Sequence, residues 1–304
     1  MTFDLALTDE QDAIIASARG VLAGPLDWRH CADIGWFGLA LPEDAGGVGF
    51  GIVEAAVLQR EIGRALVAGP FLPTVVAARA ALDAGDQDLL GSLVSGDVRA
   101  SALVGRFFVD GRDDDVAVVI RPDGLTVFDA ASLELGDAVD PVDGQGTVRR
   151  ASVTAGARVS LLGTRMWHYL LVLAAAQLTG IAERARDLAV EHATNREQFG
   201  RPIGVNQAIK HPCADMAVRA DLAYAQVLVA ARALDRGDAE ARVEATSAAA
   251  VSLDAALANG RAAIQCHGGM GFTAEHPVHR TVGRARVVER IIGGRAAVLD
   301  ALVD

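Results

Sequence analysis

The feature that most constrains the fold of this 304-residue chain is a change in hydrophobic period along its length. From residue 165 onward, apolar residues recur at helical spacing, and many of them are alanines that allow helices to approach closely. We expect helices over 165–195, 204–235, 239–266 and from about 283 to the end. Two glycines at 293–294 weaken the last of these. Short loops favour antiparallel packing in a four-helix bundle.

The middle of the chain consists of short runs rich in Val, Thr and Ser, separated by Gly, Asp and Pro. These runs cover 101–109, 116–120, 125–128, 147–153 and 158–162. The segment Arg-Pro-Asp-Gly at 121–124 has the composition of a hairpin turn. We therefore expect a small β unit.

The first third of the chain also has helical patterns. Thr8 followed by Gln11 forms a capping-box pattern that opens a helix running to about Leu22. Further helices are expected over 29–34, 52–63, 75–84 and 87–94. The predicted fold is mainly α with a small β domain. It comprises an N-terminal helical domain at 1–100, a reduced β domain at 101–162 and a C-terminal helical bundle at 163–304.

Composition excludes several classes of function. The net charge is -11 and no basic face is visible, which argues against a nucleic-acid partner. Three scattered cysteines indicate a reducing, cytoplasmic compartment, and they form no metal-ligand spacing with the histidines. The most apolar stretch, 166–181, is shorter than the roughly 20 residues of a membrane span. The first residues lack the basic region of a signal peptide.

The first candidate site is the segment Arg-Glu-Gln-Phe-Gly-Arg-Pro-Ile at 196–203. One interpretation is a helix end whose cations face the negative end of the helix dipole. The other is an anion site, in which Arg196 offers a fork of donors to phosphate and Phe199 covers a ring or ribose. The residues alone leave both open.

The second candidate site is the segment Gln-Cys-His-Gly-Gly at 265–269. Its glycines could end a helix in the left-handed conformation. Alternatively, Gly268 and Gly269 could let the bare backbone approach a pyrophosphate while Gln265 donates a hydrogen bond. Again, both interpretations stand.

Together the two motifs resemble the C-terminal domain of acyl-CoA dehydrogenases. Gln207 and the segments 214–216 and 275–278 extend the resemblance, and 39–49 and 61–64 resemble the family's N-terminal domain. The resemblance is weakest from about 100 to 160. It implies FAD as cofactor, an acyl-CoA as substrate and an electron-transfer flavoprotein as acceptor. In such enzymes a carboxylate removes the Cα proton while hydride leaves Cβ for the flavin.

The resemblance also implies which residues contact the cofactor. Carried over residue by residue, they are Arg196, Gln198, Phe199, Gln207, Gln265, Gly268 and Gly269. They would touch a flavin seated mainly in a neighbouring chain.

The usual catalytic base is missing. The family places a glutamate in a Glu-Gly-Thr segment, and the matching position here is Ile292. The alternative position, within 165–171, also has no acid, so we assign no catalytic residue. Two substitutes are conceivable, Glu289 one helical turn away and His168. We expect them to be a solvated surface glutamate and a histidine at the edge of the core instead.

The middle unit departs from the family as well. It lacks the Thr-rich, Gly-Ser-Asp-like segment and the Trp-x-Thr-like strand that seat the flavin ring, and 112–115 is expected to be a solvated turn. The pattern resembles the shorter, base-lacking subunit of actinobacterial α2β2 acyl-CoA dehydrogenases, some of which act on sterol-derived CoA thioesters. Such a subunit completes the FAD site of a partner and is not active alone. The alternatives are a self-sufficient enzyme with a displaced base and a non-enzymatic acyl-CoA-binding homologue.

Overall fold

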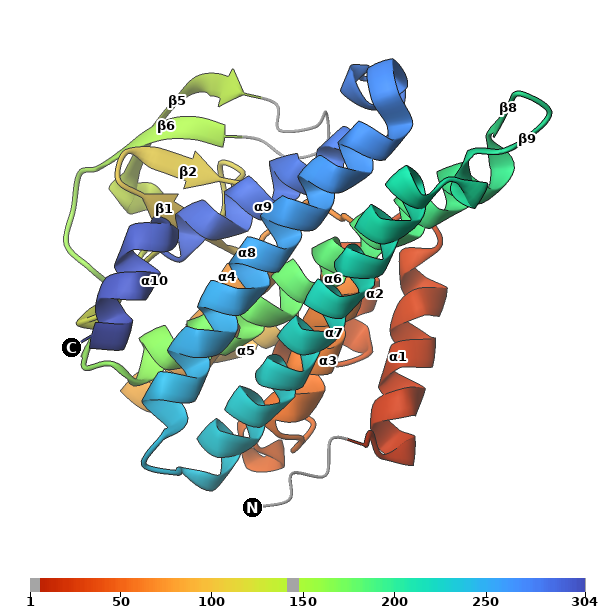
Figure 1. Ribbon diagram of the computed structural model, residues 1–304. Helices are drawn as coiled ribbons and strands as arrows, with labels where there is room; N and C mark the ends of the chain where they lie inside the picture. The colour runs from red at the N-terminus through yellow and green to blue at the C-terminus, as the bar shows by residue number, and fades with distance from the viewer. Residues whose placement is uncertain (1–5, 141–147, 304) are drawn as a thin grey trace.

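The computed structural model describes residues 6–140 and 148–303, and it has the expected order of helices, sheet and helices (Figure 1). The N-terminal part contains α1 (Asp9–Leu22), α2 (Trp28–Asp33), α3 (Ile52–Arg64), α4 (Phe71–Ala84) and α5 (Gln87–Val94). The predicted class, mainly α with a small β domain, is confirmed. The division of the chain into three domains stays a prediction.

The first helix begins as its sequence predicts. The Thr8 hydroxyl accepts a hydrogen bond from the Gln11 backbone N–H, and the Gln11 side chain accepts one from the Thr8 N–H. By contrast, α4 begins four residues before its predicted start. Pro73 lies in its first turn, where a missing N–H leaves no helical hydrogen bond unmade.

A seven-stranded mixed sheet follows, in the order β5-β6-β2-β1-β3-β4-β7. Only β1 and β3 run parallel among the described pairs. The strands are β1 (Ala100–Val104), β2 (Phe107–Val109), β3 (Val116–Arg121), β4 (Gly124–Phe128), β5 (Leu133–Asp140), β6 (Val148–Val153) and β7 (Val159–Leu162).

The sheet corrects three sequence predictions. The run at 101–109 is two strands, because Gly105 turns the chain with φ +61°. Strand β5 was not predicted, since its Glu, Gly and Asp residues are typical of loops. The turn at 112–115 is not wholly solvated, because Asp115 is buried and accepts hydrogen bonds from Arg99 and Ser101. The hairpin at 121–124 is confirmed by the pairing of Arg121 with Gly124. Residue 147, which opens one predicted run, lies outside the described residues.

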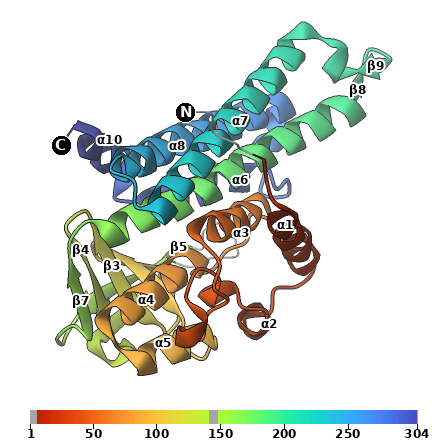
Figure 2. The same ribbon diagram turned by 90° about the horizontal axis from the view of Figure 1, so that it is seen from below.

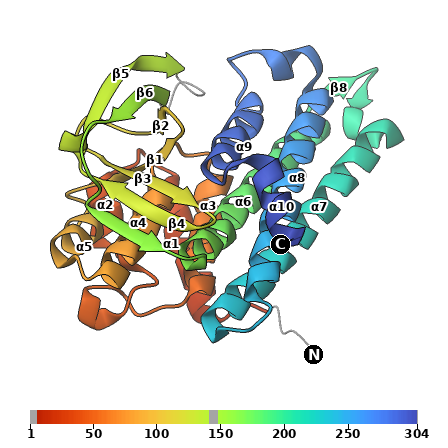
Figure 3. The same cartoon turned by 90° about the vertical axis from the view of Figure 1, so that its left-hand side faces the viewer.

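The C-terminal part contains α6 (Arg165–Asn195), α7 (Gln207–Arg236), α8 (Ala241–His267), α9 (His279–Ile291) and α10 (Gly294–Val303). Figures 2 and 3 show α6 running through the middle of the molecule, with α3 and the sheet on one side and α7 and α8 on the other. The single predicted last helix is two helices. Gly293 and Gly294 both take a positive φ, which ends α9 and redirects the chain.

Helices α3 and α6 cross with their backbones in contact. A Cβ built on Gly63 would lie 2.1 Å from the Gln177 carbonyl oxygen, and one on Gly180 would lie 1.9 Å from the Arg60 carbonyl oxygen. The crossing also carries buried polar contacts. The Gln177 amide donates to Gln59, and Arg60 pairs with Glu183 at 2.7 Å.

One buried ion pair joins the sheet to the C-terminal helices. Arg284 of α9 lies 2.9 Å from the carboxylate of Asp110, the residue that follows β2. Their side chains are only 7% and 4% exposed. The pair therefore fixes α9 against the sheet. Among the described residues, no helix is long and apolar enough to cross a membrane.

Candidate functional site

The first predicted motif forms a hairpin that projects from the end of α6 (Figure 1). Arg196 caps α6, β8 (Glu197–Gln198) pairs with β9 (Arg201–Pro202), and the Ile203 N–H donates to the Arg196 carbonyl at 2.8 Å. At the tip, Phe199 takes a positive φ of 55° and its side chain is fully exposed. Neither that backbone conformation nor that exposure stabilises the chain itself.

The second predicted motif forms the end of α8 and the short helix η6 (Gly268–Phe272) that follows. Gly268 has φ +62°, and a Cβ on Gly268 or Gly269 would meet no atom within 4 Å. The Gln265 side chain is exposed and makes no hydrogen bond within the part of the chain that the structure describes, while its backbone carbonyl accepts from the Gly268 N–H. The segment thus presents bare backbone and a free amide to the outside.

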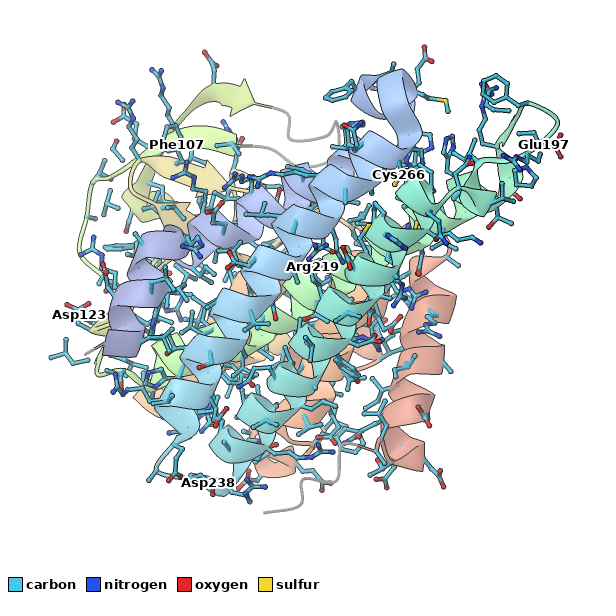
Figure 4. All side chains as sticks on the ribbon, viewed as in Figure 1. Phe107, Asp123, Glu197, Arg219, Asp238 and Cys266 are labelled. Atoms are coloured by element: carbon cyan, nitrogen blue, oxygen red, sulfur yellow. The ribbon has the colours of Figure 1, made fainter. Side chains whose placement is uncertain are left out.

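Contacts between histidines bring the two motifs to one end of the bundle. The rings of His192 on α6 and His267 on α8 stack with centroids 4.3 Å apart. Figure 4 shows Glu197 in the hairpin and Cys266 near the end of α8 at that end, with Asp238 at the opposite one. The expected cofactor residues are all exposed there: Arg196, Gln198, Phe199, Gln207, Gln265, Gly268 and Gly269.

The structure places the residues considered for the catalytic base away from solvent. Ile292 is completely buried at the end of α9. The prediction that Glu289 is a solvated surface residue is wrong, because it is 8% exposed and its carboxylate lies 2.5 Å from the Arg286 guanidinium. His168 is buried at the start of α6, and burial together with nearby Arg242 lowers its pKa.

Sequence reasoning missed a cavity of about 800 Å³ between the sheet and α9. Figure 4 marks Phe107 on its sheet side. Its walls are mainly apolar with three arginines, two of which lie four residues apart on α9, a spacing that could have signalled a shared face. The lining residues are Val104, Gly105, Arg106, Phe107, Val109, Val148, Gly283, Arg286, Val287 and Arg290. None of them is a carboxylate, and Glu289 and His168 are not among them.

In the part of the chain that the structure describes, no group of three or more His, Cys, Asp or Glu residues is placed to hold a metal ion.

Comparisons with known proteins support the resemblance. Residues 8–95 match the model of the acyl-CoA dehydrogenase N-terminal domain, and residues 171–303 match that of the acyl-CoA dehydrogenase C-terminal domain. The chain is 35% identical over 280 residues to the acyl-CoA dehydrogenase IpdE2 of Mycobacterium tuberculosis, covering 90% of this chain and 85% of that protein. The chain belongs to the acyl-CoA dehydrogenase family. Members of this family are FAD-binding oxidoreductases that act on CH–CH bonds.

Two further acyl-CoA dehydrogenases bear on the architecture. FadE34 of Mycobacterium tuberculosis is 36% identical over 284 residues. The matched segment covers 86% of this chain but only 39% of FadE34, so the chain spans well under half the length of that relative. The solved Tcur3481-Tcur3483 steroid acyl-CoA dehydrogenase is 25% identical, with a TM-score of 0.81 and coverage of 97% of both chains. The fold of this chain is therefore that of the acyl-CoA dehydrogenase family.

Proposed function

We propose that this chain is the accessory subunit of a heteromeric, FAD-dependent acyl-CoA dehydrogenase that acts on a sterol-derived CoA thioester. In this proposal the chain completes the FAD site of a partner subunit, and that partner supplies the catalytic base. The observation that carries the proposal is the combination of an outward-facing set of cofactor residues with a buried isoleucine at the expected position of the base.

The exposed end of the bundle fits the anionic part of FAD. Arg196 has no carboxylate partner among the described residues, and the open backbone at Gly268 can approach a pyrophosphate closely. The bound flavin would supply the hydride acceptor. Because Phe199 has no packing role within the chain, contact with a second chain or its cofactor gives its exposed ring a function.

The lack of a base supports the need for a partner. Thioester α-protons are weakly acidic, so their removal requires a carboxylate in a water-poor pocket. The cavity beside α9 has no carboxylate in its described lining, and Glu289 is already engaged by Arg286. A partner subunit that carries the glutamate would supply the missing base.

The relatives support the heteromeric arrangement and the substrate class. FadE34 is more than twice as long as the segment that this chain matches, so it contains sequence beyond one copy of this chain. The Tcur3481-Tcur3483 structure is named after two proteins and is described as a steroid acyl-CoA dehydrogenase. By analogy we propose an α2β2 assembly in the cytoplasm, with an electron-transfer flavoprotein as electron acceptor.

The visible spectrum tests the proposal. The chain purified alone should be colourless, and the complex formed by co-expression with a base-containing homologue from the same genome should carry one flavin per heterodimer. A lone chain that is already yellow and reduces a dye with acyl-CoA would overturn the accessory role.

Arg196→Ala should weaken FAD retention by the complex by about ten- to a hundredfold, because a hydrogen bond to a charged group contributes roughly 1.5–3 kcal/mol. Flavin release during dilution, followed by fluorescence, measures this. Arg236→Ala is the matched control, since Arg236 is an exposed arginine at the opposite end of α7. Equal retention by both variants would remove Arg196 from the cofactor site.

The cavity beside α9 favours a second candidate, a chain that binds a CoA thioester by itself. Its volume suits a small-molecule ligand, and Arg106 and Arg290 have no acidic partner among the described residues. Calorimetric titration of the lone chain with an acyl-CoA distinguishes the candidates. Binding without dye reduction would indicate a non-enzymatic acyl-CoA-binding protein, and dye reduction would indicate a displaced base.

A further inference from the structure

Three histidine rings connect the two exposed motifs, and we call His192, His267 and His276 the histidine stack. The His267 ring lies between the other two, with both centroid separations at 4.3 Å. His192 lies near the end of α6, His267 ends α8, and His276 lies in the segment that leads into α9. The stack therefore holds together three segments that are distant in the sequence.

The hydrogen bonds of His267 and His276 fix the tautomers of these two rings. Nδ1 of His267 lies 2.7 Å from the Ala263 carbonyl oxygen, so this nitrogen carries the proton. Its Nε2 is buried and has no hydrogen-bond partner among the described residues.

His276 has the opposite tautomer. Its Nδ1 accepts a hydrogen bond from the Val278 N–H at 3.2 Å, so this nitrogen must be unprotonated. The contact imitates the turn in which an Asn or Asp side chain accepts from the backbone two residues on. Protonation would turn the acceptor into a donor that faces another donor. The turn ahead of α9 would then lose its hydrogen bond.

All the charged and titratable neighbours of these rings except Glu191 lower their pKa values. Burial lowers the pKa of His192, and His267, His276 and Arg196 lower it further. Burial also lowers the pKa of His276, as do His267 and His279, while Glu191 opposes them. Cys213 of α7 and Cys266 of α8 lie in the adjoining apolar cluster and bring no charge, since burial raises the pKa of both thiols.

We propose that the histidine stack is a pH-sensitive positioning device, which holds the Arg196 hairpin and the Gln265–Gly269 segment in register for the cofactor only while the rings of His192 and His276 are neutral. The role of the device in cofactor binding rests on the proposed function. The opening of the stack itself is a property of this chain alone.

The sign of the pH effect follows from the lowered pKa values. An open or unfolded segment has histidines near the ordinary pKa of 6.5, so it binds more protons than the closed stack as the pH falls below that value. Acidification through 6.5 and below therefore favours opening. Above 6.5 both states are neutral and the full stability of the closed stack is retained.

Amide hydrogen exchange of the full chain tests the device. After correction for intrinsic rates, peptides covering 268–278 should exchange severalfold faster at pH 5.5 than at pH 7.5. His276→Asn should reduce the difference between the two pH values to the part that His192 contributes, because the asparagine oxygen accepts from the Val278 N–H and does not titrate. His276→Phe should exchange fast at both. His30→Phe, at an exposed position on α2, should behave as the unchanged chain.

The two proposals fail separately. Exchange over 268–278 that is independent of pH in the unchanged chain, or acid sensitivity in His276→Asn equal to that of the unchanged chain, would overturn the device whatever the flavin does. In the assembled complex, FAD retention should fall with the same pH dependence and depend less on pH in His276→Asn. A complex that binds no FAD at either pH would overturn the proposed function and leave the exchange result standing.

Discussion

Gly180→Ala should lower the free energy of unfolding by about 3 kcal/mol or more, the upper end of the cost of overpacking. The added Cβ would lie 1.9 Å from the Arg60 carbonyl oxygen and 2.7 Å from the Arg64 nitrogen, so α3 and α6 would have to separate. Backbone atoms cannot move aside as a flexible side chain does. Separation would also disturb the buried Arg60–Glu183 and Gln59–Gln177 contacts.

Urea unfolding followed by circular dichroism measures this effect. Gly91→Ala is the matched control, since Gly91 lies in α5 and a Cβ there meets nothing within 4 Å. That change should be neutral or stabilise the chain by up to about 1 kcal/mol, the helix preference of alanine over glycine. Similar unfolding midpoints for the two variants would contradict the close crossing of α3 and α6.

Arg284→Ala should lower the free energy of unfolding by about 3–5 kcal/mol, because it leaves the Asp110 carboxylate buried without its partner. The two side chains are 7% and 4% exposed, so water cannot replace the lost guanidinium without opening the contact between α9 and the sheet. Asp110 also has a positive φ, which only a firmly held turn maintains in a non-glycine residue.

The same unfolding measurement applies, with Arg295→Ala as control. Arg295 makes the same two-pronged contact with Asp254, but both side chains are more than half exposed. Solvent screening makes such surface pairs nearly neutral for stability. The Asp110–Arg284 pair would have no structural role if its loss changed the unfolding midpoint no more than the loss of the exposed pair.

The sequence was most informative where structure depends on neighbouring residues. The cap at Thr8, the full length of α6 and the turn at 121–124 are local patterns, and all are confirmed. The two site motifs were identifiable for the same reason, because each is a continuous segment. Their location at one end of the bundle follows from the antiparallel packing of long helices.

Features that depend on distant partners could not be predicted. Asp115 is buried because the Arg99 guanidinium and the Ser101 hydroxyl donate hydrogen bonds to its carboxylate. No local sequence pattern predicts that contact. The cavity beside α9 forms only when the sheet packs against a helix more than a hundred residues later. The stacking of His192 on His267 likewise exists only once α6 and α8 have packed.

The burial of Ile292 restricts which side chains this position can accept. The side chain is completely enclosed where α9 ends, just before Gly293 and Gly294 redirect the chain. A glutamate introduced there would enter the hydrophobic core, where desolvation would favour its protonated form and oppose folding. A base could therefore occupy this position only if the surrounding core were rebuilt first. Under the proposed function, the need for a partner would be maintained by packing as well as by the absence of a carboxylate.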